Sequence, residues 1–206
     1  GRLRAQLGIA PQAPVLLVLP GSRPGEISRV LPPFADAVAI LKAARPDLEV
    51  IIPAAPTVAS SVKEQASGWA HVVEGESAKL DAMKAATVAL ACSGTVTTEL
   101  ALAGVPIVVG YRLGAMTHAI LKRLIRTPYI TLFNIAAKDF VAPELVQDDC
   151  NGPALAREVA LRLDDPALRE RQAAAQTAAL LKMGRGGPDP SDVAADAVLK
   201  VLGSRA

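Results

Sequence analysis

A turn that carries an arginine follows the first strongly apolar segment of the chain. The segment is residues 15–18, all Val or Leu, and the turn runs from Leu19 to Arg23 with the sequence LPGSR. In open α/β folds, a small-residue turn at the carboxyl end of a buried strand is where phosphates bind. Gly21 permits close backbone approach, and the planar fork of Arg23 matches phosphate oxygens. The turn, with Ser22, therefore indicates an anion site, although a surface turn with a solvated arginine could have the same letters.

A second strand, turn and helix pattern supplies groups that suit a nucleotide. Ser93, Gly94 and Thr95 follow the apolar residues 88–90, and Glu99 lies one helical turn after Thr95. We expect Ser93 to be the N-cap and the first-turn amides of the helix to face a phosphate. Glu99 suits the paired hydroxyls of a ribose. Together the two turns predict a nucleotide diphosphate that lies across two strand ends. The alternative is that Ser93 and Thr95 only cap the helix, while Glu99 offsets its dipole.

Short Val, Ile and Leu runs alternate with longer alanine-rich stretches along the whole chain. This alternation predicts an α/β fold, a Rossmann-like open parallel sheet with helices on both faces. The expected strands lie near 15–19, 49–53, 71–73, 87–91, 106–110 and 129–132. The expected helices lie near 26–44, 57–67, 78–85, 95–103, 115–126 and 152–164. Arg112 follows one of these strands, so its side chain is a candidate for the ligand crevice.

Composition limits the classes of partner. A chain of 206 residues with 51% hydrophobic and 20% charged residues fits one large ordered domain. A net charge of +2 and 3% aromatic residues argue against nucleic acid as a partner. Cys92 and Cys150 have no metal-ligand spacing, and we expect reduced thiols in a cytoplasmic protein. The motifs have no adjacent pair of Asp residues, so we predict that the site works without a metal.

Residues 115–126 form a candidate amphipathic helix. Met116, Ile120 and Leu124 have helical spacing, with basic side chains elsewhere around the helix. Such a helix could lie on an anionic membrane surface, or it could face the core and solvate its basic side, which is the commoner arrangement. We expect no secretory signal, because Arg2 and Arg4 are not followed by an apolar segment, and no uncharged run is long enough to span a bilayer. Peripheral contact with the inner face of the bacterial inner membrane is therefore left open.

The ordered motifs resemble those of lipid-A-disaccharide synthases, bacterial inverting glycosyltransferases of the two-domain GT-B architecture. The resemblance covers nearly the whole chain. It rests on LPGSR with Glu26 just after it, on SGT-x-x-x-E from Ser93 to Glu99, on GYR at residues 110–112 and on the NI of LFNI at residues 132–135. The family usually has proline where Phe133 stands, but its functional asparagine is present as Asn134.

The resemblance implies that the chain is the carboxyl-terminal half of such an enzyme, the half that binds the donor. The implied reaction joins UDP-2,3-diacylglucosamine to lipid X, the acylated glucosamine 1-phosphate, and releases UDP without a cofactor. The proposed catalytic acidic residue of the family lies in the amino-terminal half. We assign catalytic roles to Arg23 and Asn134. The predicted substrate-binding residues are Gly21, Ser22, Arg23, Ser93, Gly94, Thr95, Glu99, Arg112 and Asn134.

The resemblance also divides the chain into two parts. Residues 1–183 are the predicted nucleotide-sugar-binding domain, and residues 184–206 are a glycine-rich linker and a final helix. Asp189 is the candidate N-cap of that helix and Pro190 its first residue. Its apolar face could cover the sheet of this domain, but the two-domain architecture favours packing toward an amino-terminal domain.

Two other functions remain open from the sequence. One is a non-hydrolysing UDP-sugar epimerase of the same architecture, against which LFNI and GYR argue. The other is a UDP-binding module that has no turnover by itself. Oligomeric state is also left open.

Overall fold

A single parallel sheet forms the centre of the structure, a computed structural model that describes residues 2–114 and 127–203. Within these residues the strand order is β3-β2-β1-β4-β5-β6. The strands are β1 (Val15–Leu19), β2 (Glu49–Ala54), β3 (His71–Glu74), β4 (Val88–Ala91), β5 (Ile107–Tyr111) and β6 (Glu144–Val146). The predicted fold class, an open parallel sheet with helices on both faces, is confirmed.

Helices cover both faces of the sheet. One face packs against α2 (Pro24–Ala44), α3 (Ala59–Ala66) and α8 (Gly152–Asp164). The other packs against α1 (Arg2–Gln6), α4 (Glu76–Ala85), α5 (Thr95–Leu102), α7 (Leu132–Ala137) and α9 (Pro166–Lys182). A 3₁₀ turn at Gln147–Asp149 and a last helix, α10 (Pro190–Gly203), complete the described elements.

The central strands β1 and β4 are apolar throughout because both of their faces are buried. In β1, Leu16 and Val18 belong to one core, while Val15, Leu17 and Leu19 belong to the core on the opposite face. All of β1 is buried. A strand in such a sheet appears in the sequence as a continuous apolar run, which is why β1 and β4 could be predicted closely.

The strand predicted at residues 129–132 is wrong. Helix α7 begins at Leu132, and the sixth strand lies later in the chain, at Glu144–Val146. The Glu144 carboxylate accepts hydrogen bonds from the amides of Ile130 (2.9 Å) and Thr131 (2.7 Å). These amides are therefore occupied by a side chain and do not pair with a neighbouring strand.

Helix α9 was not predicted, because much of what it buries is polar. Its buried residues are Gln172, Gln176, Ala179 and Leu180. The Nε2 atoms of the two glutamines donate to the carbonyls of Ile107 (2.7 Å) and Val105 (2.9 Å). The helix is thus fixed to the backbone at the start of β5 by hydrogen bonds, and a search for apolar periodicity overlooks it.

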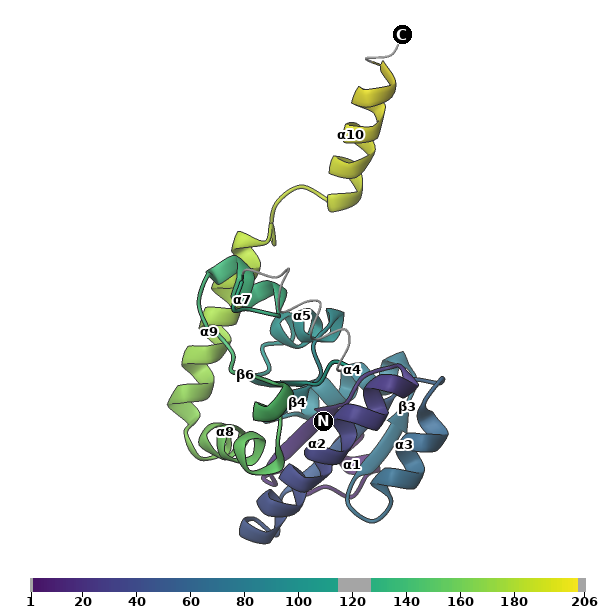
Figure 1. Cartoon of the computed structure of the whole chain (residues 1–206), viewed down its shortest axis with the longest axis vertical. Helices are drawn as coiled ribbons and strands as arrows, with labels where there is room; N and C mark the ends of the chain where they lie inside the picture. Colours follow the sequence, from purple (N-terminus) through teal and green to yellow (C-terminus); the bar gives the residue numbers. More distant parts are fainter. Residues whose placement is uncertain (1, 115–126, 204–206) are drawn as a thin grey trace.

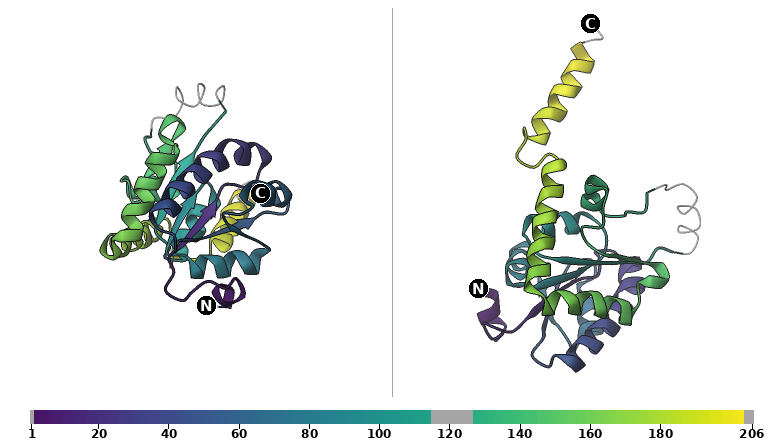
Figure 2. Two further views of the ribbon diagram at one scale, coloured as in Figure 1. Left: turned by 90° about the horizontal axis from the view of Figure 1, so that it is seen from below. Right: turned by 90° about the vertical axis from the view of Figure 1, so that its left-hand side faces the viewer.

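Helix α10 extends away from the sheet (Figures 1 and 2). It begins as predicted, since Asp189 Oδ1 accepts a hydrogen bond from the Ser191 amide (2.7 Å) and Pro190 is its first residue. The described side chains of residues 191–203 are exposed, so the helix does not cover the sheet of this domain. Its packing toward an amino-terminal domain remains a prediction.

The amphipathic helix predicted at 115–126 lies outside the described residues. Among the helices that the structure does describe, none combines the length and apolar character needed to cross a membrane.

Gly110 of the GYR motif provides a test of core packing. A Cβ at this position would lie 2.5 Å from Cε1 of the buried Phe34 and 3.1 Å from Cδ2 of Leu155. We expect Gly110→Ala to lower the free energy of unfolding by about 1–3 kcal/mol, because the ring must move in a close-packed core. Urea denaturation measures this change. Gly114→Ala is the matched control, because no atom of the described residues lies within 4 Å of the Cβ that it would add. Equal destabilisation by both substitutions would contradict the packing explanation.

Candidate functional site

The carboxyl ends of β1, β2 and β4 surround a cavity of about 550 Å³. It lies where the strand order reverses between β1 and β4, which is where open α/β sheets hold ligands. The two turns predicted from the sequence meet here. The predicted site residues that line the cavity are Gly21, Ser22, Arg23, Ser93, Gly94, Thr95 and Glu99.

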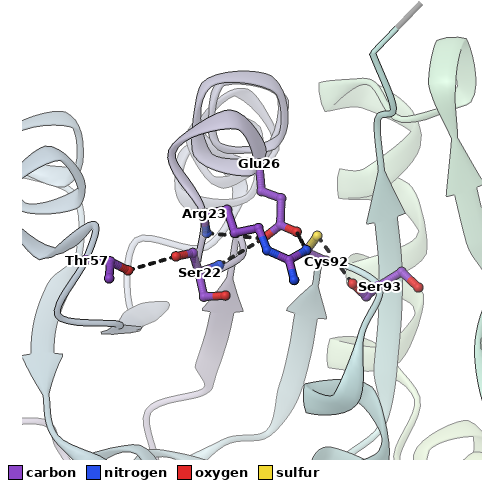
Figure 3. Close-up of polar contacts among 6 residues, drawn as sticks. All are labelled: Ser22, Arg23, Glu26, Thr57, Cys92 and Ser93. Carbon is purple, nitrogen blue, oxygen red and sulfur yellow. Dashed lines mark hydrogen bonds and ion pairs between the residues drawn. The ribbon is translucent and has the colours of Figure 1, made fainter. Parts of the chain in front are cut away.

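The turn after β1 is held by Glu26, in the first turn of α2 (Figure 3). Glu26 Oε2 accepts hydrogen bonds from the amides of Ser22 (3.0 Å) and Arg23 (3.3 Å). Arg23 Nη1 lies 3.2 Å from Glu26 Oε1. The Glu26 side chain is 14% exposed and that of Arg23 is 81% exposed. The carboxylate therefore holds the turn from inside, while the guanidinium stands at the mouth of the cavity.

This arrangement changes how the turn can bind an anion. Two of its backbone amides already donate to an internal carboxylate, so an incoming phosphate meets mainly the Arg23 side chain. Gly21 is needed for a different reason from the one expected. Its φ is +116°, and a Cβ there would lie 2.5 Å from Glu26 Oε2. The glycine makes room for the carboxylate that shapes the turn.

The turn after β4 leaves the start of α5 open. The N-cap is Gly94, with no side-chain cap, so the prediction that Ser93 is the N-cap is wrong. Thr97 Oγ1 donates to the Gly94 carbonyl (2.7 Å) and tightens the first turn. Among the described residues, none accepts a hydrogen bond from the amides of Thr95 and Val96. These amides, at the positive end of the helix dipole, can donate to an anion in the cavity.

Lys79 in α4 was missed by the sequence analysis, although it also lines the cavity. Its Nζ lies 2.8 Å from Glu76 Oε2 and 2.9 Å from Glu99 Oε2. The two carboxylates raise the pKa of Lys79 by hydrogen bonding, so it is a cation at neutral pH. Within the described part of the chain, no group of three or more His, Cys, Asp or Glu side chains is placed to hold a metal ion.

Arg112 lies outside this cavity. It lines a second one of about 380 Å³, together with Ser28, Arg29 and Gln147. The side-chain oxygen of Gln147, a residue with φ of +55°, accepts a hydrogen bond from the Leu113 amide (2.6 Å). The second cavity is largely polar in its lining residues and contains two guanidinium groups.

Asn134 is completely buried, and both polar atoms of its side chain bond to backbone. Its Nδ2 donates to the Ala142 carbonyl (2.9 Å), and its Oδ1 accepts from the Ala142 amide (3.1 Å). These bonds join α7 to the segment that leads into β6. Asn134 is not among the residues that line either cavity, so its catalytic role remains a prediction.

A sequence model of the family described as lipid-A-disaccharide synthetase matches residues 1–189. A lipid-A-disaccharide synthase of Rhodospirillum centenum is 44% identical over 207 aligned residues, which cover 99% of this chain and 52% of that protein. The chain spans about half the length of the curated relatives it matches.

Solved structures with low sequence identity share the fold. The UDP-GlcNAc 2-epimerase of Neisseria meningitidis, bound to UDP-GlcNAc, aligns with a TM-score of 0.58 at 14% identity, over 88% of this chain and 47% of that one. WaaG, a glycosyltransferase involved in lipopolysaccharide biosynthesis, aligns with a TM-score of 0.56 at 17% identity, over 84% and 44%. Transferase and epimerase therefore resemble the chain equally in fold, and fold alone does not separate them.

The buried thiols give a prediction for pH. Burial raises the pKa of Cys92 to about 12 and also raises the pKa of Cys150. We expect neither thiol to be alkylated by iodoacetamide at pH 8 in the folded chain, because the thiolate is the reactive form. Mass spectrometry should show double labelling only in denaturant. Rapid labelling of the folded chain would contradict the assigned environment.

The same pKa shift predicts a loss of stability in alkali. The folded state holds the Cys92 proton more tightly than the unfolded state, whose thiol has an ordinary pKa near 9. The contribution to stability is therefore fully present below pH 9 and is lost as the pH rises from about 9 toward 12. Urea denaturation of the wild type and Cys92→Ala across this range measures it, and the alanine variant should show a smaller alkaline loss.

Proposed function

The chain belongs to the lipid-A-disaccharide synthase family, and on that premise we propose that it is the donor-binding half of a glycosyltransferase. The proposed reaction joins UDP-2,3-diacylglucosamine to lipid X and releases UDP. This chain would hold the uridine diphosphate in the cavity at the ends of β1 and β4. The acceptor and a general base would come from an amino-terminal half, as in the two-domain architecture that the motifs resemble.

The observation that carries this proposal is the position of Arg23. Its guanidinium is exposed at the mouth of a cavity that also contains the open start of α5. When the sugar leaves the donor, negative charge grows on the diphosphate. A planar cation and the positive end of a helix can stabilise this charge without a metal. The exposed guanidinium can reach a ligand while Glu26 holds its backbone.

The other wall of the cavity suits the nucleoside. Glu99 lies one helical turn after Thr95, so a diphosphate at the helix start would bring a ribose toward its carboxylate. Its side chain is 41% exposed, which leaves it accessible to the ribose hydroxyls. We propose that Glu99 accepts hydrogen bonds from them.

Arg112 and Asn134 do not line the cavity that would hold the diphosphate. Arg112 faces the second cavity, where it could orient a part of the donor beyond the diphosphate. Asn134 acts first on the backbone at Ala142, so its effect on the reaction would be through the position of α7.

Family membership favours the transferase over the epimerase. The family match spans most of the chain, whereas the epimerase structure matches only in fold. A module that binds UDP but has no turnover by itself is compatible with the same site. The three functions are separated in a protein that joins this chain to an amino-terminal half. Disaccharide formed from the acylated donor and lipid X identifies the transferase, epimerised UDP-sugar identifies the epimerase, and UDP binding with neither product identifies the binding module.

We expect the chain by itself to bind UDP with a dissociation constant on the order of 0.1–1 mM, because one wall of the two-domain cleft is not part of it. Arg23→Ala should weaken binding about fivefold, which corresponds to about 1 kcal/mol for one exposed charge-assisted contact. Isothermal titration calorimetry measures both values. Arg171→Ala, which removes an exposed arginine from α9, is the matched control. Disaccharide formation by this chain alone would contradict the need for a second half.

In a protein that joins this chain to an amino-terminal half, we expect Arg23→Ala to lower turnover more than it weakens donor binding. The loss should be about 2–4 kcal/mol in activation free energy, roughly thirtyfold to a thousandfold in rate. Arg23→Lys should recover only part of it, because an ammonium keeps the charge and loses the fork. Steady-state kinetics with the acylated donor test this. Near-normal activity of Arg23→Ala would mean that the turn is only structural.

A further inference from the structure

We propose that Lys79 is a positioning residue for nucleotide recognition, which fixes the Glu99 carboxylate so that it can select a ribose. The inference rests on the proposed function, because it assumes that Glu99 accepts the ribose hydroxyls. It adds a residue from α4 to a site that the motifs place only on the turns after β1 and β4.

The geometry joins two helices across the cavity. Lys79 lies in the first turn of α4, which starts after Gly75 at the end of β3, whereas Glu99 lies in α5. The ammonium of Lys79 is 2.9 Å from Glu99 Oε2. Gly75, Lys79 and Glu99 all line the cavity. Among the described residues, none donates a hydrogen bond to Oε1 of Glu99. One oxygen is therefore held by the lysine, and the other is available to a ligand.

The burial of Lys79 distinguishes this pair from an ordinary surface ion pair. The Lys79 side chain is 22% exposed, whereas Lys84 on the same helix is 77% exposed and lies 3.7 Å from Asp81. Salt screens the interaction of a partly buried lysine less than that of an exposed one. Two carboxylates that hold one lysine also share the entropy cost of ordering its side chain, which an isolated exposed pair must meet alone. Lys79 is thus able to restrict the rotamers of Glu99.

Lys79 also reduces the net negative charge of the cavity. The ionised side chains among the described lining residues are two cations, Arg23 and Lys79, and three carboxylates, Glu26, Glu76 and Glu99. Their sum is −1 before a ligand enters. Removal of Lys79 would make it −2, which disfavours a diphosphate and leaves Glu99 without a cation. Lys79 therefore allows a carboxylate to stand beside an anion site.

The experiment compares the affinity for UDP with the affinity for 2′-deoxy-UDP and 3′-deoxy-UDP. In the wild-type chain, we expect the ribose hydroxyls to give a preference of roughly tenfold to a hundredfold, the value of a hydrogen bond to a charged acceptor. Glu99→Gln should lose most of this preference. Lys79→Met should also lose most of it, while Lys79→Arg should retain it because a cation still reaches Glu99. Lys84→Met is the matched control and should keep the wild-type preference.

The outcomes separate the inference from the proposed function. If the wild-type chain binds no UDP, the proposed function fails and the inference fails with it. If Glu99→Gln loses the preference and Lys79→Met keeps it, only the inference is overturned. An equal loss of affinity for UDP and both deoxy analogues in Lys79→Met also overturns it, because Lys79 would then act on the phosphates. Thermal unfolding checks that each variant is folded, and Lys79→Gln replaces the methionine variant if that variant is not.

Discussion

The reversal of strand order between β1 and β4 is the constraint on which the site depends. From β1 the chain proceeds to β2 and β3 on one side, and β4 begins the series on the other. Leu19 pairs with Ala91, so both strands end at the same level. The following turns therefore part at one edge of the sheet and leave an opening that side chains line. Because both strands are buried on both faces, the core fixes this opening before any ligand arrives.

Within the opening, the turn after β1 is shaped by a side chain of the protein itself, Glu26. Glu26 takes the amides that a phosphate would otherwise use, and Gly21 provides the space for its carboxylate. A turn satisfied in this way keeps its shape when the cavity is empty. Recognition then falls to the open amides at the start of α5 and to the side chains on the rim, of which Arg23, Glu76, Lys79 and Glu99 carry charge.

The residues of the two turns could be predicted from the sequence, whereas the contacts between residues far apart in the chain could not. The two turns could be predicted because an apolar run, a glycine and a polar residue lie next to each other in the chain. The strand predicted at 129–132 failed because Glu144, more than ten residues later, takes the amides of that segment. Lys79 could not be recognised, since nothing in the residues near it shows that its partner is Glu99 on another helix. The motif at residues 132–135 pointed to Asn134, but a motif does not reveal that a side chain is buried against Ala142.

Both cations on the rim of the cavity are already paired with carboxylates. Arg23 is paired with Glu26, and Lys79 with Glu76 and Glu99. If a diphosphate binds Arg23 as proposed, it would replace the Glu26 carboxylate at the guanidinium, while Lys79 would keep its contact with Glu99. Such an exchange reduces the net gain on binding. When such a diphosphate left, Glu26 would pair with Arg23 again, so no unpaired charge would hold the product in place. Under the proposed function, this pairing would favour release of UDP, which carries the same diphosphate as the donor and would otherwise compete with it for the site.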